Sequence, residues 1–178
     1  MKSKIIIIAC MCSLFITGAA PYNKEYDLNK QCYTYNLSVE QKFKSYMDYK
    51  TITDKTSDQY ILQKYAVTSY KGMRCLNERY LIAVGTGFNA RIGQYVDIVL
   101  DNGYVIPCIV GDIKADKDTD EYNISNTVNG CCTEFIIDND VLNKCVAKSG
   151  DMSSIYSWWD YSINSINILN ECVNLEEL

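Results

Sequence analysis

The sequence predicts a mainly β fold built as a small barrel, on two observations. Residues that favour strands are abundant, with fifteen tyrosines and many Ile, Val and Thr, whereas the chain has only two prolines. Short apolar runs, bounded by Gly, Asn and Asp, follow one another closely in the second half of the chain. Such strands with close turns and few helices are typical of small barrels. The 178 residues indicate one domain.

Five segments have the pattern of strands, and turn signals separate them. Asp101-Asn102-Gly103 is a strong hairpin signal between two of them. Pro107, inside the returning strand, indicates an edge or a bulge. Asp138-Asn139-Asp140 is expected to cap a short helical turn near Val141–Ala147. The predicted strands are 80–84, 96–100, 104–110, 134–137 and 163–169.

The first nineteen residues have the features of a signal peptide. Lys2 and Lys4 precede an apolar stretch that lasts to about Ile16, and small residues follow, with cleavage expected after Ala19. An uncleaved membrane anchor is the alternative, although the apolar run is short for a span. We therefore expect a protein that is secreted or held in the cell envelope.

Residues 20–70 are expected to form an N-terminal extension or linker, because 21–50 are polar and lack strong periodicity. Within them, Ser38 followed three residues later by Gln41 fits the start of a short helix over Ser38–Tyr49. Residues 58–67 are compatible with either a helix or a strand. The barrel domain is expected over 71–170, and a C-terminal tail over 171–178.

The composition excludes several kinds of chemistry and partner. The chain has no histidine, so Ser-His-Asp and Cys-His catalysis and imidazole-bound zinc are impossible within it. Any acid-base catalyst must be Asp, Glu, Lys, Tyr or Cys. The net charge is −5, and −7 without Lys2 and Lys4. An acidic domain is poorly suited to nucleic acid or to an anionic membrane surface, so we expect neither partner beyond the signal peptide.

The cysteine count does not decide between disulfides and free thiols. Seven of the nine cysteines lie after the signal peptide, and export would permit disulfides. An odd number leaves at least one unpaired within the chain, and buried thiols are the alternative for the others. No CxxC spacing occurs, so the sequence predicts no metal site. It predicts no cofactor either.

Five segments, 82–85, 92–93, 101–103, 110–112 and 135–138, carry turn, strand-end and glycine signals in a fixed order. This order resembles the three-aspartate (3D) type of double-psi β-barrel domain. Those domains occur in peptidoglycan-active proteins and in lytic transglycosylases, and rare-lipoprotein-A-like and expansin-like barrels are more distant relatives. The resemblance covers roughly Tyr80–Met152 and implies a six-stranded double-psi β-barrel with short helices and an N-terminal extension. A second resemblance is to uncharacterised proteins of anaerobic Gram-positive bacteria and their phages.

By this resemblance, Asp112 and Asp138 are the candidate catalytic residues. Asp112 matches the Asp that closes the central strand, and Asp138 matches the Asp of a later strand. The family's first aspartate falls on Gly85, and its glycine-rich loop is replaced by residues 113–116. A lytic transglycosylase can use one carboxyl group as acid and then as base, because the sugar's 6-hydroxyl is the nucleophile. The alternatives are a turn residue for Asp112 and a helix N-cap for Asp138.

Four further residues are candidates for substrate binding. Lys114 and Asp116 follow the central strand, and Trp158 and Trp159 could stack on sugar rings. Surface ion pairing is the alternative for Lys114, and a solvated loop for Asp116 with Asp118 and Asp120. Core or edge packing is the alternative for the two tryptophans.

These observations predict an exported enzyme that cleaves the glycan strands of peptidoglycan. One alternative is a non-catalytic module that binds peptidoglycan or another envelope component. The other is a phage-derived structural protein that keeps the barrel without its chemistry. An enzyme needs Asp112 and Asp138 in one cleft, whereas a binding module needs exposed aromatic side chains.

Overall fold

The structure, a computed structural model, describes residue 20 and residues 22–178. The signal peptide predicted over residues 1–19 lies outside these residues. In the described part, the protein is mainly β, and ten strands belong to one sheet. No helix in that part is long and apolar enough to cross a lipid bilayer.

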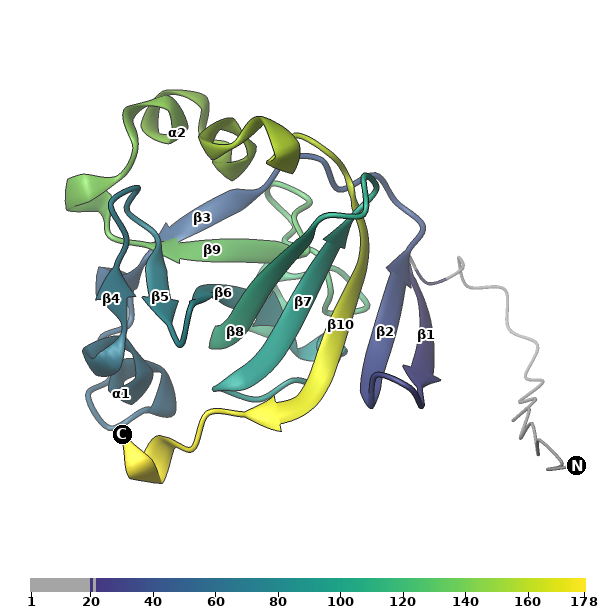
Figure 1. The fold of residues 1–178 in the computed structure, drawn as a ribbon, viewed down its shortest axis with the longest axis horizontal. Helices are drawn as coiled ribbons and strands as arrows, with labels where there is room; N and C mark the ends of the chain where they lie inside the picture. The colour runs from purple at the N-terminus through teal and green to yellow at the C-terminus, as the bar shows by residue number, and fades with distance from the viewer. Residues whose placement is uncertain (1–19, 21) are drawn as a thin grey trace, which may run out of the picture.

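The strands and helices alternate irregularly along the chain (Figure 1). Single 3₁₀ turns occupy several of the connections. The strands are β1 (Tyr22–Asp27), β2 (Cys32–Leu37), β3 (Ser45–Asp48), β4 (Val67–Thr68), β5 (Arg74–Leu76), β6 (Arg79–Gly85), β7 (Gln94–Leu100), β8 (Val105–Lys114), β9 (Thr133–Ile137) and β10 (Ile163–Cys172). The helices are α1 (Asp58–Tyr65) and α2 (Lys144–Ser149).

Pairing places the strands in the order β1-β2-β10-β7-β8-β6-β5-β4. β9 joins β6 by antiparallel pairing and joins β3 by parallel pairing. β6 and β8 form a second parallel pair, whereas β7, β8 and β10 pair antiparallel and lie side by side (Figure 1). A backbone hydrogen bond of 3.1 Å from Ile163 N to Gln41 O links the start of β10 to the segment just before β3.

The five strands predicted from the sequence are present as β6, β7, β8, β9 and β10. The hairpin at Asp101-Asn102-Gly103 is also present, with Gly103 at φ +80°. Pro107 has a strand neighbour on one side only, because β8 pairs with β6 from Cys108 onward. The missing N–H of this proline therefore leaves no gap in the ladder beside β6.

The helix predicted over Ser38–Tyr49 is wrong. Residues 38–44 have no regular structure, and β3 follows them. Parallel pairing with β9 outweighs the local capping pattern. The region 20–70 also does more than extend the domain, because β2 pairs with β10 and so joins the hairpin of β1 and β2 to the sheet (Figure 1).

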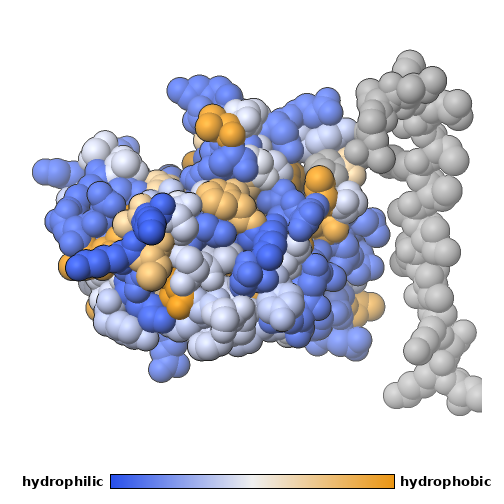
Figure 2. Space-filling view, turned by 90° about the horizontal axis from the view of Figure 1, so that it is seen from above, coloured by the Kyte–Doolittle hydropathy of each residue, from blue (hydrophilic) through white to orange (hydrophobic). Residues whose placement is uncertain are grey.

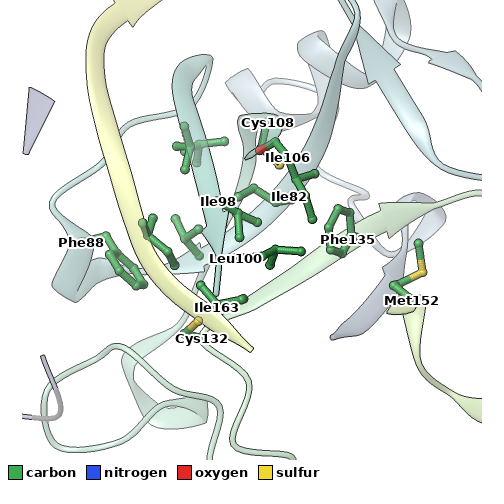
Figure 3. Packing of buried hydrophobic residues seen from close by; sticks show 14 of the residues in the cluster. Ile82, Phe88, Ile98, Leu100, Ile106, Cys108, Cys132, Phe135, Met152 and Ile163 are labelled. Atoms are coloured by element: carbon green, nitrogen blue, oxygen red, sulfur yellow. Dashed lines mark hydrogen bonds between the residues drawn. The ribbon is translucent and has the colours of Figure 1, made fainter. Parts of the chain in front are cut away.

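Two hydrophobic cores lie on opposite sides of the sheet. The main core takes alternate side chains of β6, β7, β8, β9 and β10, together with Phe88, Met152 and Trp159. Figure 3 shows Ile82, Ile98 and Phe135 within it. The second core consists of Leu62, Ala66, Leu81, Ile109, Ile136 and Val173. Helix α1 therefore covers part of the outer face of the sheet.

Most of the segment 58–67, which is compatible with either a helix or a strand by sequence, forms helix α1. Ser57 caps it by accepting a hydrogen bond from Tyr60 N at 3.2 Å. At its other end, the buried Arg74 on β5 donates to the carbonyl oxygens of Gln63 and Ala66. These contacts fix α1 against the sheet beside β8.

The C-terminal residues predicted as a tail pack near α1. β10 continues to Cys172, and Val173 is buried in the second core. Leu175 and Leu178 pack against the same core. Figure 1 shows the end of the chain beside α1. The seven cysteines of the described part are all free thiols.

The face of the molecule drawn in Figure 2 is mostly hydrophilic, with hydrophobic residues in separate patches. Scattered exposed hydrophobic residues are normal for a folded domain.

Candidate functional site

A one-residue bulge in β8 sets the direction of the Asp112 side chain. Val110 belongs to the main core and pairs with Ile82 on β6. The next pair along β6 joins Ala83 to Asp112, so Gly111 is left without a partner. Because side chains alternate along a strand, the extra residue turns Asp112 to the outer face.

Beyond the bulge, the alternation continues with the opposite phase. Ile113 packs against the main core, and Asp112 and Lys114 lie on the outer face of the sheet. Gly111 is the residue that fits the bulge, because a Cβ there would lie 2.7 Å from Ile136 Cδ1 and 3.1 Å from Leu81 Cβ. A larger residue would have to displace the second core.

An acidic pocket of about 310 Å³ opens on this outer face. This volume is at the lower end of the range for small-ligand sites. Three carboxylates and one lysine are among the ten residues that line the pocket, and Met47 and Asn126 are two of its six uncharged residues; the charged ones are Asp112, Asp118, Glu134 and Lys114. It therefore combines acids, a cation and an amide in one concave surface.

Burial in this pocket raises the pKa of the Asp112 carboxyl above its ordinary value of 3.8. Hydrogen bonds from Ile113 N and from the Gln59 side chain act in the opposite direction, because they stabilise the carboxylate. The charge of Glu134 raises the pKa further, and the charge of Lys114 lowers it. A raised pKa lets Asp112 hold a proton that it can give to a leaving group.

Glu134 is the second carboxylate of the pocket. Its strand, β9, pairs with β6 on the side opposite β8, and Glu134 and Asp112 both pair with Ala83. The two acids therefore lie in one cross-strand row and on the same face. The sequence did not predict this residue as part of a site. Its signal was a charged residue within a predicted strand, directly before Phe135.

Lys114, on β8, forms an ion pair with Glu134, on β9, within the acidic pocket. Its Nζ lies 3.6 Å from Glu134 Oε1 and 3.5 Å from Cys131 O, and its side chain is almost fully buried. Asn126 Nδ2 and Asn129 Nδ2 also donate to Glu134 Oε1, at 3.2 and 3.3 Å. Lys114 is thus a buried ion-pair partner, whereas surface pairing was the alternative expected from the sequence.

Asp138 does not lie with Asp112. It follows β9 at the end away from Glu134, four residues along the chain, which corresponds to roughly 13 Å of strand. Its side chain accepts from Asp140 N at 3.2 Å and so caps a 3₁₀ turn. Lys50 Nζ lies 3.8 Å from its carboxylate. The helix-cap interpretation is therefore the one that its contacts support.

Asp116 and the two tryptophans also lie apart from the acidic pocket. Asp116 is exposed and accepts a hydrogen bond from Thr86 Oγ1. Trp159 is buried and stacks on Phe135, with ring centroids 5.3 Å apart, so it is a core residue and not a sugar platform. Trp158 is exposed and stacks on Tyr156, with centroids 4.8 Å apart.

Gly85, which the resemblance matches to the first aspartate of 3D-type domains, has no room for a side chain. A Cβ on Gly85 would collide with the backbone oxygen of Asn123. Asn123 belongs to the loop between β8 and β9, where Asp120 Oδ1 accepts from Tyr122 N and Ile124 N. Close packing of this loop on β6 therefore accounts for the glycine.

A larger pocket of about 400 Å³ lies between α1 and the segment that precedes it. Lysines and mainly apolar side chains line it, with no Asp or Glu among them. It cannot provide a carboxylate acid. In the described residues, no group of three or more Cys, Asp or Glu is placed to hold a metal ion.

The acidic pocket is thus the one described pocket that joins a carboxyl group of raised pKa to a second acid and a cation. Such a perturbed group in a concave site is a candidate for proton transfer. No family model, curated protein or solved structure matches the chain.

Proposed function

We propose that the chain is an exported enzyme that cleaves glycosidic bonds in the glycan strands of peptidoglycan. The acidic pocket is its active site, and Asp112 is the proton donor. The observation that carries the proposal is the half-buried Asp112, whose pKa is raised by burial in a pocket that also holds Lys114. Export rests on the signal-peptide pattern of residues 1–19.

The fold part of the proposal is a six-stranded barrel of double-psi type. Its supports are the continuous pairing order β10-β7-β8-β6-β9-β3 and the two parallel pairs within it. The hydrogen bond between Ile163 and Gln41 brings the two ends of this series together. The resemblance to 3D-type domains then suggests a cell-wall substrate.

Cleavage of a glycosidic bond begins with a proton for the leaving oxygen. Asp112 can supply it, because burial holds its carboxyl in the neutral form to a higher pH than for an exposed aspartate. In the lytic-transglycosylase-like route, the same carboxylate then takes the proton of the sugar's 6-hydroxyl. That route requires only Asp112.

The test is incubation of the purified protein with peptidoglycan and mass analysis of the released fragments. Wild type should release soluble muropeptides, and Asp112→Asn should lower the rate at least 100-fold. Asp101→Asn is the matched control, because Asp101 is exposed at the hairpin between β7 and β8. Full activity in Asp112→Asn, or no release by the wild type, would contradict the proposal.

A non-catalytic binding module is the second candidate function. The exposed Trp158, stacked on Tyr156, favours it, because stacked aromatic rings can bind sugar faces. Sedimentation with insoluble peptidoglycan tests it. Binding without any released fragment, lost in Trp158→Ala and kept in Asp112→Asn, would favour the module over the enzyme.

A further inference from the structure

A mechanism with one acid gives no catalytic role to Glu134, the second carboxylate of the acidic pocket. Glu134 lines the pocket with Asp112, from the strand on the other side of β6. Two strand spacings separate their backbones, which is about 10 Å between Cα atoms. The pocket therefore has one carboxylate on each side of β6.

The contacts of Glu134 fix the direction of its carboxyl group. Lys114 Nζ forms an ion pair with it, and two amide groups, from Asn126 and Asn129, donate to the same carboxylate oxygen. All three partners contact the same carboxylate oxygen, Oε1.

Asp112 has a different environment within the same pocket. It is half-buried, and burial is the largest influence on its pKa, in the direction that favours the neutral form. A half-buried carboxyl group of raised pKa beside a carboxylate that is paired with a lysine is an arrangement that suits an acid and a base in one site.

We propose that Glu134 is the general base of a two-carboxylate site, and that cleavage is hydrolysis with inversion at the anomeric carbon. This inference rests on the proposed function and replaces its single-acid route. Inverting enzymes place their carboxyl groups roughly 6.5–9.5 Å apart, which leaves room for a water molecule. Retaining enzymes place them at about 5–5.5 Å. Side chains that start two strands apart fit the wider spacing.

The step balances without any added reagent. Glu134 takes a proton from water as the water oxygen bonds to the anomeric carbon. The glycosidic C–O bond breaks, and its electron pair goes to the leaving oxygen, which takes the proton of Asp112. The products are a hemiacetal sugar and an alcohol. Asp112 is then ionised and Glu134 protonated, and exchange with solvent restores both.

The experiment is product analysis in ¹⁸O-labelled water, with a soluble fragment of peptidoglycan glycan as substrate. Wild type should form a reducing end that carries ¹⁸O, first as the inverted anomer. Glu134→Gln should lower kcat at least 100-fold with little change in KM. Glu171→Gln, an exposed acid on β10, is the matched control. In Glu134→Ala, added formate or azide should restore part of the rate, because a small anion can replace the base.

The double variant Lys114→Met/Glu134→Gln separates loss of the general base from a folding defect. It removes the base without leaving a buried lysine unpaired, and it should fold and remain inactive. Unlabelled 1,6-anhydro products, or near wild-type kcat in Glu134→Gln or in the double variant, would overturn the inference while the role of Asp112 stands. Absence of any cleavage by the wild type would overturn the proposed function as well.

Discussion

Lys114 Nζ lies 3.6 Å from Glu134 Oε1, and both side chains are largely buried between β8 and β9. A charge in such a place is stabilised mainly by its partner, since little water reaches it. The pair therefore couples the stability of the domain to the acidic pocket.

The first prediction concerns that pair. Lys114→Met leaves Glu134 buried without its cation, and the free energy of unfolding should fall by about 3 kcal/mol. The double variant with Glu134→Gln should lose less than the two single losses added together. Urea denaturation of the four proteins measures this coupling. Strictly additive losses would show that the two charges do not interact.

The second prediction concerns the pH dependence of stability at Asp112. Its pKa is raised in the folded state, so above pH 3.8 the folded protein binds more protons here than the unfolded chain. The free energy of unfolding contributed by this residue therefore falls as pH rises from 3.8 through the raised pKa. Asp112→Asn removes that fall.

Urea denaturation between pH 3 and pH 7 provides the measurement. The variant should gain stability relative to the wild type across the window that begins at pH 3.8, and the difference should then level off. Asp101→Asn serves as the exposed control. A difference between Asp112→Asn and wild type that stays constant with pH would contradict the raised pKa.

The third prediction separates the two adjacent tryptophans. Trp159 is buried against Phe135, and truncation to Ala should cost about 3–5 kcal/mol of unfolding free energy. Trp158 is exposed, and Trp158→Ala should cost only about 1 kcal/mol, for its stack on Tyr156. Chemical denaturation of both variants distinguishes them. Equal losses would mean that Trp158 also packs in the core.

The fourth prediction concerns the bulge. In Gly111→Ala the new methyl group meets Ile136 and Leu81, so the domain should lose about 1–3 kcal/mol through overpacking. Gly103→Asn is the control, because no atom lies within 4 Å of a Cβ there and Asn tolerates its positive φ. Thermal unfolding of both variants is the measurement. Unchanged stability in Gly111→Ala would show that the second core accommodates the added methyl group without loss of free energy.

The strands of the second half of the chain could be predicted because their apolar runs and turns are local signals. The hairpin at Asp101-Asn102-Gly103 is the clearest case. The strands β2 and β3 were not predicted, since they form by pairing with distant strands, and β1 pairs with β2 alone. The Ser38 capping pattern predicts a helix where β3 forms, because pairing with the distant strand β9 outweighs the local signal.

The candidate site was predictable in part. Asp112 at the end of an apolar strand is a visible signal, and it lies in the acidic pocket. Asp138 has the same signal but lies at the far end of β9, because the sequence does not show the direction in which a strand enters the sheet. Glu134 becomes a neighbour of Asp112 only through the shared partner Ala83.

The bulge at Gly111 gives strand register, and not only residue identity, control over the chemistry of this surface. If Gly111 took the pairing place of Asp112 opposite Ala83, the alternation of β8 would be regular and the carboxylate of Asp112 would point inward, among the apolar side chains. No residue would have changed type. A shift of one residue in the pairing of β8 with β6 would therefore remove the acid from the pocket without any change of sequence.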